Sequence, residues 1–152
     1  PFELLGARTK KELQLWIQRA ASDEGMTEYL EEVLSEGNIA SAKKLLEQDT
    51  QALVAVIRLM ADPEAKINIR LGVGVLIEDL AESEIFSTVT PLLIEYLSDA
   101  DPRIRGDACH YLSLTKNRDF IPQIEELLSD ESAEVREIAR DSLEELNAIR
   151  GH

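Results

Sequence analysis

Apolar side chains recur at every third or fourth position through most of the chain, which is the spacing of one face of an α-helix. Strand-like alternation of apolar and polar residues is absent. We therefore expect an all-α fold. A first helix is predicted from Thr9 to about Ser22, and the later helices are expected near residues 27–35, 38–47, 50–61, 63–81, 85–97, 102–115, 120–128 and 132–149.

Two dipeptides mark helix starts clearly. Asp62-Pro63 and Asp101-Pro102 each place a side-chain oxygen that can cap a helix before a proline at the first helical position. Proline has no backbone N–H, and at that position the missing donor is not needed for helical hydrogen bonding. The pattern predicts that helices begin at residues 63 and 102.

A segment of the chain occurs twice. Residues 97–108 return as residues 128–139, so that Arg105 matches Arg136 at a displacement of 31 positions. A weaker copy at residues 62–70 matches at a displacement of 35, with extra residues in its turn. Two helices and a turn of this length cannot bury an apolar face alone, so the period predicts stacked helical hairpins that share one core.

The repeated pattern is an apolar helix, a turn with aspartate and often proline, and then Val/Ile-Arg-x-x-Ala. It resembles HEAT repeats, in particular the short repeats of phycobilisome-lyase-like proteins, strongly over residues 84–149. The resemblance implies a right-handed α-solenoid of stacked HEAT-like hairpins. We expect one domain, with atypical helices in 1–49, a degenerate repeat in 50–82, a repeat in 84–115 and a C-terminal capping repeat in 116–149.

In that family, turn aspartates and helix arginines of neighbouring repeats form a hydrogen-bonded ladder. An arginine at a fixed offset from a carboxylate can make planar paired hydrogen bonds, which would fix one hairpin against the next. The resemblance assigns this structural role to Arg70, Asp99, Asp101, Arg105, Asp130 and Arg136.

Charge restricts the partners that we expect. The 152 residues carry a formal net charge of −14, with nine basic and twelve acidic residues in 1–76 and seven basic and eighteen acidic residues in 77–152. A surface of this sign disfavours nucleic acids and anionic membranes, and it favours a protein or peptide that is basic. The simpler interpretation is that the acidic surface keeps the protein soluble.

The single cysteine, Cys109, excludes an intramolecular disulfide and fits a reducing compartment, so a cytoplasmic location is expected. No apolar run approaches the length of a membrane span. The chain begins at Pro1 and ends at Gly151-His152, which suggests either a fragment of a longer protein or a trimmed sequence with part of an added tag.

The chain offers little to catalysis. Cys109 and His110 are adjacent on a predicted helix, where successive side chains point about 100° apart, so they cannot form a nucleophile and base pair. His110 lies one turn after Asp107, for which a solvated pair is the simpler interpretation. Convergent metal ligands and phosphate-binding loops are absent. We expect no catalytic residue, no metal and no cofactor.

Gly72 and Gly74 lie inside a predicted helix, where each costs about 1 kcal/mol relative to alanine. Close approach of two helices is the favoured explanation, and a shallow recess for a partner is the alternative. In HEAT-like proteins the second helix of each hairpin lines a concave groove that binds partners. Register places the following residues on the outward face of these helices: Asn68, Leu71, Val75, Asp107, His110 and Asp141.

The favoured function is therefore a non-catalytic scaffold that binds a protein or peptide in the groove, with the oligomeric state left open. One alternative comes from residues 2–17, which resemble the C-terminal end of a thioredoxin-like domain. The chain would then be the client-binding extension of a thioredoxin-like chaperone or redox protein. A second alternative is a bilin lyase-like accessory protein, because lyase-like HEAT proteins carry out such chemistry.

Overall fold

The structure is a computed structural model that describes residues 23–149. This part of the chain contains eight α-helices and three 3₁₀ segments. The helix expected from Thr9 to Ser22 and the thioredoxin-like resemblance of residues 2–17 lie outside the described residues. The elements are α2 (Asp23–Ser35), α3 (Ile39–Gln48), α4 (Thr50–Met60), α5 (Ile67–Leu80), η2 (Glu84–Thr88), α6 (Thr90–Tyr96), α7 (Pro102–Leu114), η3 (Arg118–Phe120), α8 (Ile121–Glu125), η4 (Glu126–Ser129) and α9 (Ala133–Ala148).

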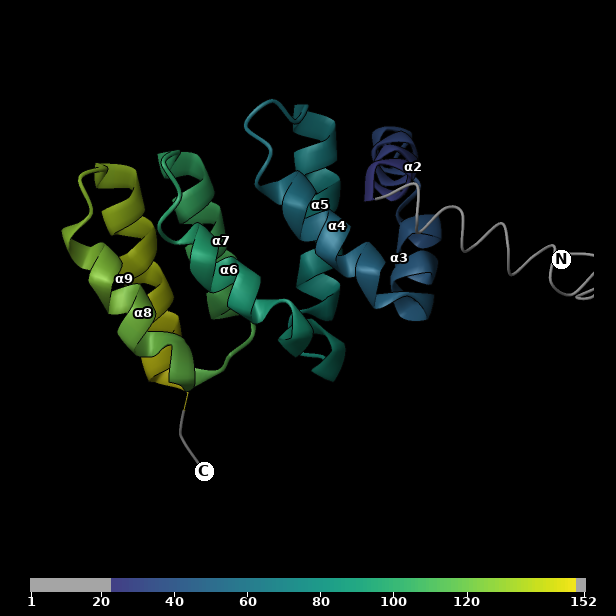
Figure 1. The fold of residues 1–152 in the computed structure, drawn as a ribbon. Helices are drawn as coiled ribbons and strands as arrows, with labels where there is room; N and C mark the ends of the chain where they lie inside the picture. The colour runs from purple at the N-terminus through teal and green to yellow at the C-terminus, as the bar shows by residue number, and fades with distance from the viewer. Residues whose placement is uncertain (1–22, 150–152) are drawn as a thin grey trace, which may run out of the picture.

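Consecutive helices form hairpins that stand side by side in a row (Figure 1). Helix α4 packs on α5, α6 on α7 and α8 on α9, and α7 also packs along α9 in the next hairpin. The leading helices α4, α6 and α8 form one layer, and the trailing helices α5, α7 and α9 form the other. This arrangement is an α-solenoid, as the repeat period predicts.

Short polar side chains begin several of these helices. Asp101 Oδ1 accepts a hydrogen bond of 2.9 Å from the Arg103 backbone N–H, and Pro102 follows as the first residue of α7. Ser132 Oγ accepts from the Val135 N–H at 3.4 Å at the start of α9. Each bond satisfies a backbone donor that has no partner within its helix. The predicted start of α7 is confirmed.

The predicted start of α5 at Pro63 is wrong, because α5 begins at Ile67. Asp62 Oδ1 does accept a hydrogen bond of 2.9 Å from the Glu64 N–H, but that turn does not continue into a helix. The extra residues of this repeat form a loop over 62–66 instead. Lys66, which precedes α5, makes no side-chain capping bond.

Two predicted leading helices are also shorter than expected. Residues 85–97 divide into η2 and α6, and residues 120–128 divide among η3, α8 and η4. A proline stands near the start of each short α-helix, Pro91 in α6 and Pro122 in α8. Proline cannot donate the backbone bond that would continue a preceding helix, and its ring clashes with the preceding turn, so each α-helix restarts there.

The core lies between the two layers and runs along the row of hairpins. Phe86, Ile57, Leu76 and Leu93 are all fully buried within it. Each hairpin contributes apolar side chains to one continuous cluster from Leu30 to Leu146. The trailing helices therefore have one face fixed in the core, and their other face is left for solvent or a partner.

Gly72 and Gly74 have different surroundings. A Cβ atom on Gly72 would lie 3.0 Å from Leu34 Cδ2 and 3.4 Å from Leu34 Cβ, so α2 crosses α5 closely at this point. A Cβ atom on Gly74 would lie 3.4 Å from the Tyr111 hydroxyl, which is an ordinary contact distance. The favoured explanation, close helix approach, thus fits Gly72 better than Gly74.

We expect Gly74→Ala to stabilise the chain by about 0.5–1 kcal/mol, because alanine restricts the unfolded backbone and favours the helix. Gly72→Leu should instead destabilise it by about 2 kcal/mol, because the added atoms force α2 away from α5. Urea unfolding followed by circular dichroism measures both changes. Equal effects of the two substitutions would contradict the assigned difference in packing.

Candidate binding surface

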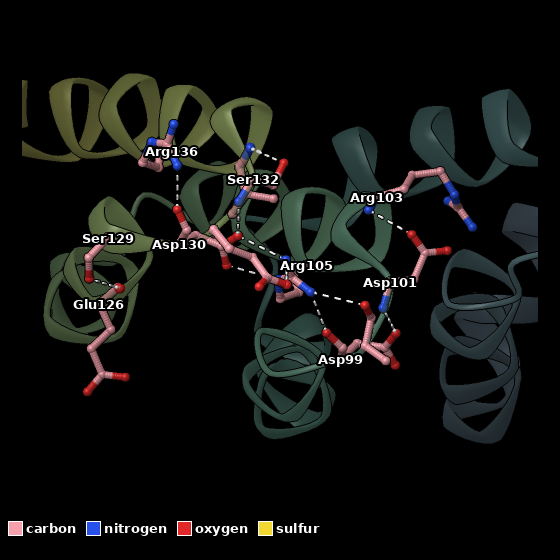
Figure 2. A network of polar contacts seen from close by, with 12 residues as sticks. Asp99, Asp101, Arg103, Arg105, Glu126, Ser129, Asp130, Ser132 and Arg136 are labelled. Atoms are coloured by element: carbon pink, nitrogen blue, oxygen red, sulfur yellow. Dashed lines mark hydrogen bonds and ion pairs between the residues drawn. The ribbon is translucent and has the colours of Figure 1, made fainter.

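A buried ion pair joins the last two hairpins. Arg105 on α7 donates from Nε to Asp130 Oδ2 and from Nη2 to Asp130 Oδ1, both at 2.9 Å (Figure 2). The side chains of Arg105 and Asp130 are only 9% and 8% exposed. A paired, nearly buried contact of this geometry holds α7 and the turn before α9 in one orientation.

Arg105 and Arg136 also bind the turns of their own repeats in the same way. Arg105 Nη1 donates to the Asp99 carbonyl at 2.9 Å, and Arg136 Nη1 donates to the Asp130 carbonyl at 2.6 Å. In both cases the acceptor lies six residues earlier in the chain. The two arginines are therefore equivalent in their own hairpins, and Figure 2 shows them on adjacent trailing helices.

The pair changes the protonation of its carboxyl group. The hydrogen bonds from Arg105 lower the pKa of Asp130 below its usual range, against the opposing effect of burial. The same bonds raise the pKa of Arg105. Asp130 also accepts from the Ser132 N–H at 2.9 Å, so one carboxylate orders the turn and binds the preceding hairpin.

Asp99 and Asp101 act within their own turn. Asp99 Oδ2 accepts a hydrogen bond of 2.9 Å from the Asp101 N–H, and the Asp101 carboxylate caps α7. Asp99 accepts the hydrogen bond from Arg105 with its backbone carbonyl and not with its carboxylate. Their roles are structural, but these two carboxylates do not form the expected contacts between repeats.

The structure does not place Arg70 in a rung like that of Arg105. Its Nε atom is buried and has no hydrogen-bond partner within residues 23–149. Arg70 lies instead near Asp107 and Tyr111; burial raises the pKa of both groups, and the charge of Arg70 opposes that rise. The longer 62–66 loop changes the geometry of this repeat, and a different arginine joins it to the next one.

That arginine is Arg103, which the sequence analysis did not assign to the ladder. Its Nη2 donates to the Asp62 carbonyl at 2.9 Å, and its Nη1 lies 3.4 Å from the Met60 carbonyl and 2.9 Å from Asp107 Oδ2. Arg103 thus connects α7 to the end of α4 and to the inserted loop. The Arg103 and Asp107 pair at a spacing of four was the available sequence signal.

The outward side of α5 carries a continuous apolar stripe, formed by Ile67, Leu71 and Val75. Their exposed fractions are 64%, 65% and 43%. They are spaced by four residues, so they follow one another along one side of the helix. Asn68 is also exposed, and its Nδ2 donates to the Ser35 carbonyl at 3.3 Å. Leu71 and Val75 are predicted at this surface from sequence register, whereas Ile67 is not.

A cavity of about 230 Å³ lies between α7 and α9. Three of the groove residues selected from the sequence, Asp107, His110 and Asp141, line it together. The Ile138 side chain packs against Gly106, which has no side chain of its own. A Cβ atom on Gly106 would lie 2.8 Å from Ile138 Cδ1. The remaining lining residues are Ser113, Ser142 and Glu145.

The apolar stripe on α5 and the cavity between α7 and α9 together form what we name the trailing-helix face. Its polar end has a partly desolvated carboxylate, because burial raises the pKa of Asp107 while Arg103 and Arg70 oppose the rise. His110 and Asp141 are exposed beside it. The face is apolar at one end and acidic at the other.

A family model for HEAT repeats matches residues 50–144. The chain belongs to the HEAT-repeat family. The matched range begins at α4 and ends within α9, so it contains α5 and α7 and most of α9. HEAT repeats generally mediate contacts between proteins and are typically non-catalytic scaffolds. No curated protein matches the chain at a significant level.

Two reactive side chains of this HEAT-repeat chain, Cys109 and Tyr111, are buried. Cys109 has no exposed surface, burial raises the pKa of its thiol to about 11, and its Sγ lies 3.7 Å from Ser142 Oγ. Burial likewise raises the pKa of Tyr111 to about 12. A thiol in this state is a poor nucleophile.

Across residues 23–149 we find no cluster of three or more His, Cys, Asp or Glu side chains arranged to hold a metal ion. None of the helices described has both the length and the apolar character needed to cross a membrane.

Proposed function

We propose that the trailing-helix face is the protein-binding surface of a non-catalytic HEAT-repeat scaffold. The observation that carries the proposal is the exposed stripe of Ile67, Leu71 and Val75. Scattered apolar residues are normal on a protein surface, whereas adjacent ones at helical spacing indicate a contact site. Burial of such side chains against a partner would stabilise a complex by about 25 cal/mol per Å² of apolar surface removed from water.

The position of the stripe supports the proposal further. It lies on a trailing helix, in the layer that neighbouring hairpins continue through α7 and α9. Repeat proteins present extended surfaces of this kind, on which several repeats contact one partner. The formal net charge of −14 favours a protein or peptide over a nucleic acid or an anionic membrane.

The double variant Leu71→Ser, Val75→Ser tests the proposal. We expect the variant to lose its partners, with affinity lowered about tenfold or more, while its melting temperature stays close to that of the parent. Leu71 is 65% exposed and Val75 is 43% exposed, so neither side chain belongs to the buried core. Affinity purification from the native host with quantitative mass spectrometry measures capture, and circular dichroism measures stability.

Leu128→Ser is the matched control, because Leu128 is a large apolar side chain that is 40% exposed on η4 in the other layer. Proteins retained by the parent chain and by this control, but lost by the double variant, support the proposal. Equal retention by all three chains would contradict it. A parallel loss of melting temperature and capture would show that the stripe belongs to the core.

A further inference from the structure

Sequence register relates the cavity to the apolar stripe. Val75, His110 and Asp141 occupy equivalent register positions on α5, α7 and α9, at displacements of 35 and 31 residues. They therefore lie at the same level on three successive trailing helices. Packed helices are about 8–10 Å apart, so a ligand that crosses from α5 to α9 spans roughly 20 Å. A short segment of a partner chain can reach both ends.

The cavity has the size of one side chain. Its volume of about 230 Å³ lies below the range of roughly 300–1,000 Å³ that is usual for small-molecule sites. His110 and Asp141, which line it, hold the register positions that correspond to Val75 in the stripe. A side chain that projects from a bound segment fits such a recess better than a free metabolite does.

The lining of the cavity selects for positive charge. Three carboxylates, Asp107, Asp141 and Glu145, surround it with two serine hydroxyls and His110. Asp107 already accepts from Arg103 at 2.9 Å, whereas Asp141 and Glu145 make no ion pair within residues 23–149. An ammonium or guanidinium group would supply the donors that these two carboxylates lack.

We propose that the trailing-helix face binds a linear segment of a partner protein that carries both apolar and basic residues. Apolar side chains of the segment lie on the stripe of Ile67, Leu71 and Val75, and one lysine or arginine enters the cavity beside Asp141 and Glu145. This inference rests on the proposed function, because it assigns partner chemistry to the same surface. Charge complementarity identifies the occupant as a basic segment.

Selection from a phage-displayed library of random linear peptides tests the inference, with the full chain as bait. We expect enriched peptides to combine an apolar pair with lysine or arginine. Binding of an enriched peptide, measured by fluorescence anisotropy, should weaken about tenfold or more in Asp141→Lys, Glu145→Lys. Raising the salt concentration should weaken it further, because part of the attraction is between charges.

The control reverses two carboxylates in a different recess. Glu32 and Glu64 line a cavity of about 300 Å³ between α2 and the 62–66 loop, and none of its lining residues belongs to α7 or α9. Glu32→Lys, Glu64→Lys changes the net charge by the same amount. We expect this control to bind the peptide within about twofold of the parent chain, because long-range charge alone contributes little.

A charge exchange distinguishes a specific contact from general attraction. A peptide with its lysine replaced by glutamate should bind Asp141→Lys, Glu145→Lys better than it binds the parent chain. Peptides that depend on Leu71 and Val75 but not on Asp141 and Glu145 would overturn this inference and leave the proposed function in place. Enriched peptides that are insensitive to both sets would overturn both.

Discussion

Arg105→Ala is expected to destabilise the chain by about 3 kcal/mol, because it leaves the Asp130 carboxylate buried without its partner. The side chain of Asp130 is only 8% exposed, so water replaces the lost bonds poorly. The loss should be local at first, since repeat proteins unfold from weakened junctions. We expect amides of α8 and α9 to lose hydrogen-exchange protection before those of α4.

Arg140→Ala is the matched control, because Arg140 is exposed on α9. Its effect on the free energy of unfolding should stay within about 0.5 kcal/mol. Urea unfolding gives the total change for each variant, and hydrogen exchange locates it. An Arg105→Ala chain as stable as the control would show that the buried pair does not hold the two hairpins together.

The difference between the parent chain and Arg105→Ala should depend on pH in a defined direction. Pairing with Arg105 lowers the pKa of Asp130 in the folded state, so the pair contributes its full stability above the unfolded pKa, about 3.9 for aspartate. As the pH falls through the lowered folded pKa, Asp130 becomes protonated and that contribution is lost. The stability gap should thus be complete at neutral pH and close in strong acid.

Arg103→Ala is expected to cost about 2 kcal/mol, because the carbonyls of Met60 and Asp62 and the carboxylate of Asp107 lose a charged donor. Loss of Arg103 should loosen a different junction from loss of Arg105, because Arg103 joins α7 to the preceding repeat. We expect faster hydrogen exchange at the end of α4 and in the 62–66 loop. The protection of α9 should change little.

Arg118→Ala provides the comparison for this substitution, because Arg118 is exposed in η3. Burial already raises the pKa of Asp107 in the folded state, and removal of Arg103 should raise it further. Protonation then relieves the unpaired carboxylate, so part of the lost stability should return as the pH falls through that raised pKa. An Arg103→Ala chain with parental exchange in α4 would contradict the assigned role.

The sequence predicted those parts of the fold that depend on local signals. Asp101-Pro102 located the start of α7 because a capping oxygen and a proline act within one turn of backbone. The displacement of 31 residues predicted that Arg105 and Arg136 occupy equivalent places, and both donate to the carbonyl six residues earlier. Leu71 and Val75 followed from register alone, because each repeat fixes which side of its trailing helix faces the core.

The features that the sequence did not predict depend on contacts between residues far apart in the chain. The same dipeptide pattern at Asp62-Pro63 predicted a helix start wrongly. The turn that Asp62 caps does not continue into a helix, and α5 starts at Ile67. The position of that loop makes Arg103 rather than Arg70 the arginine that joins the two repeats. The cavity between α7 and α9 arises where Ile138 meets Gly106, a contact that a repeat pattern does not specify.

If the layer of trailing helices binds the partner, a bound peptide must perturb these helices and not the leading ones. Backbone amide chemical shifts of the isotopically labelled chain, recorded during titration with an enriched library peptide, distinguish the two layers. We predict that the shifted amides lie in α5, α7 and α9, beginning beside Leu71 and ending beside Glu145. Shifts concentrated in α4, α6 and α8 would show that the trailing helices do not bind the peptide.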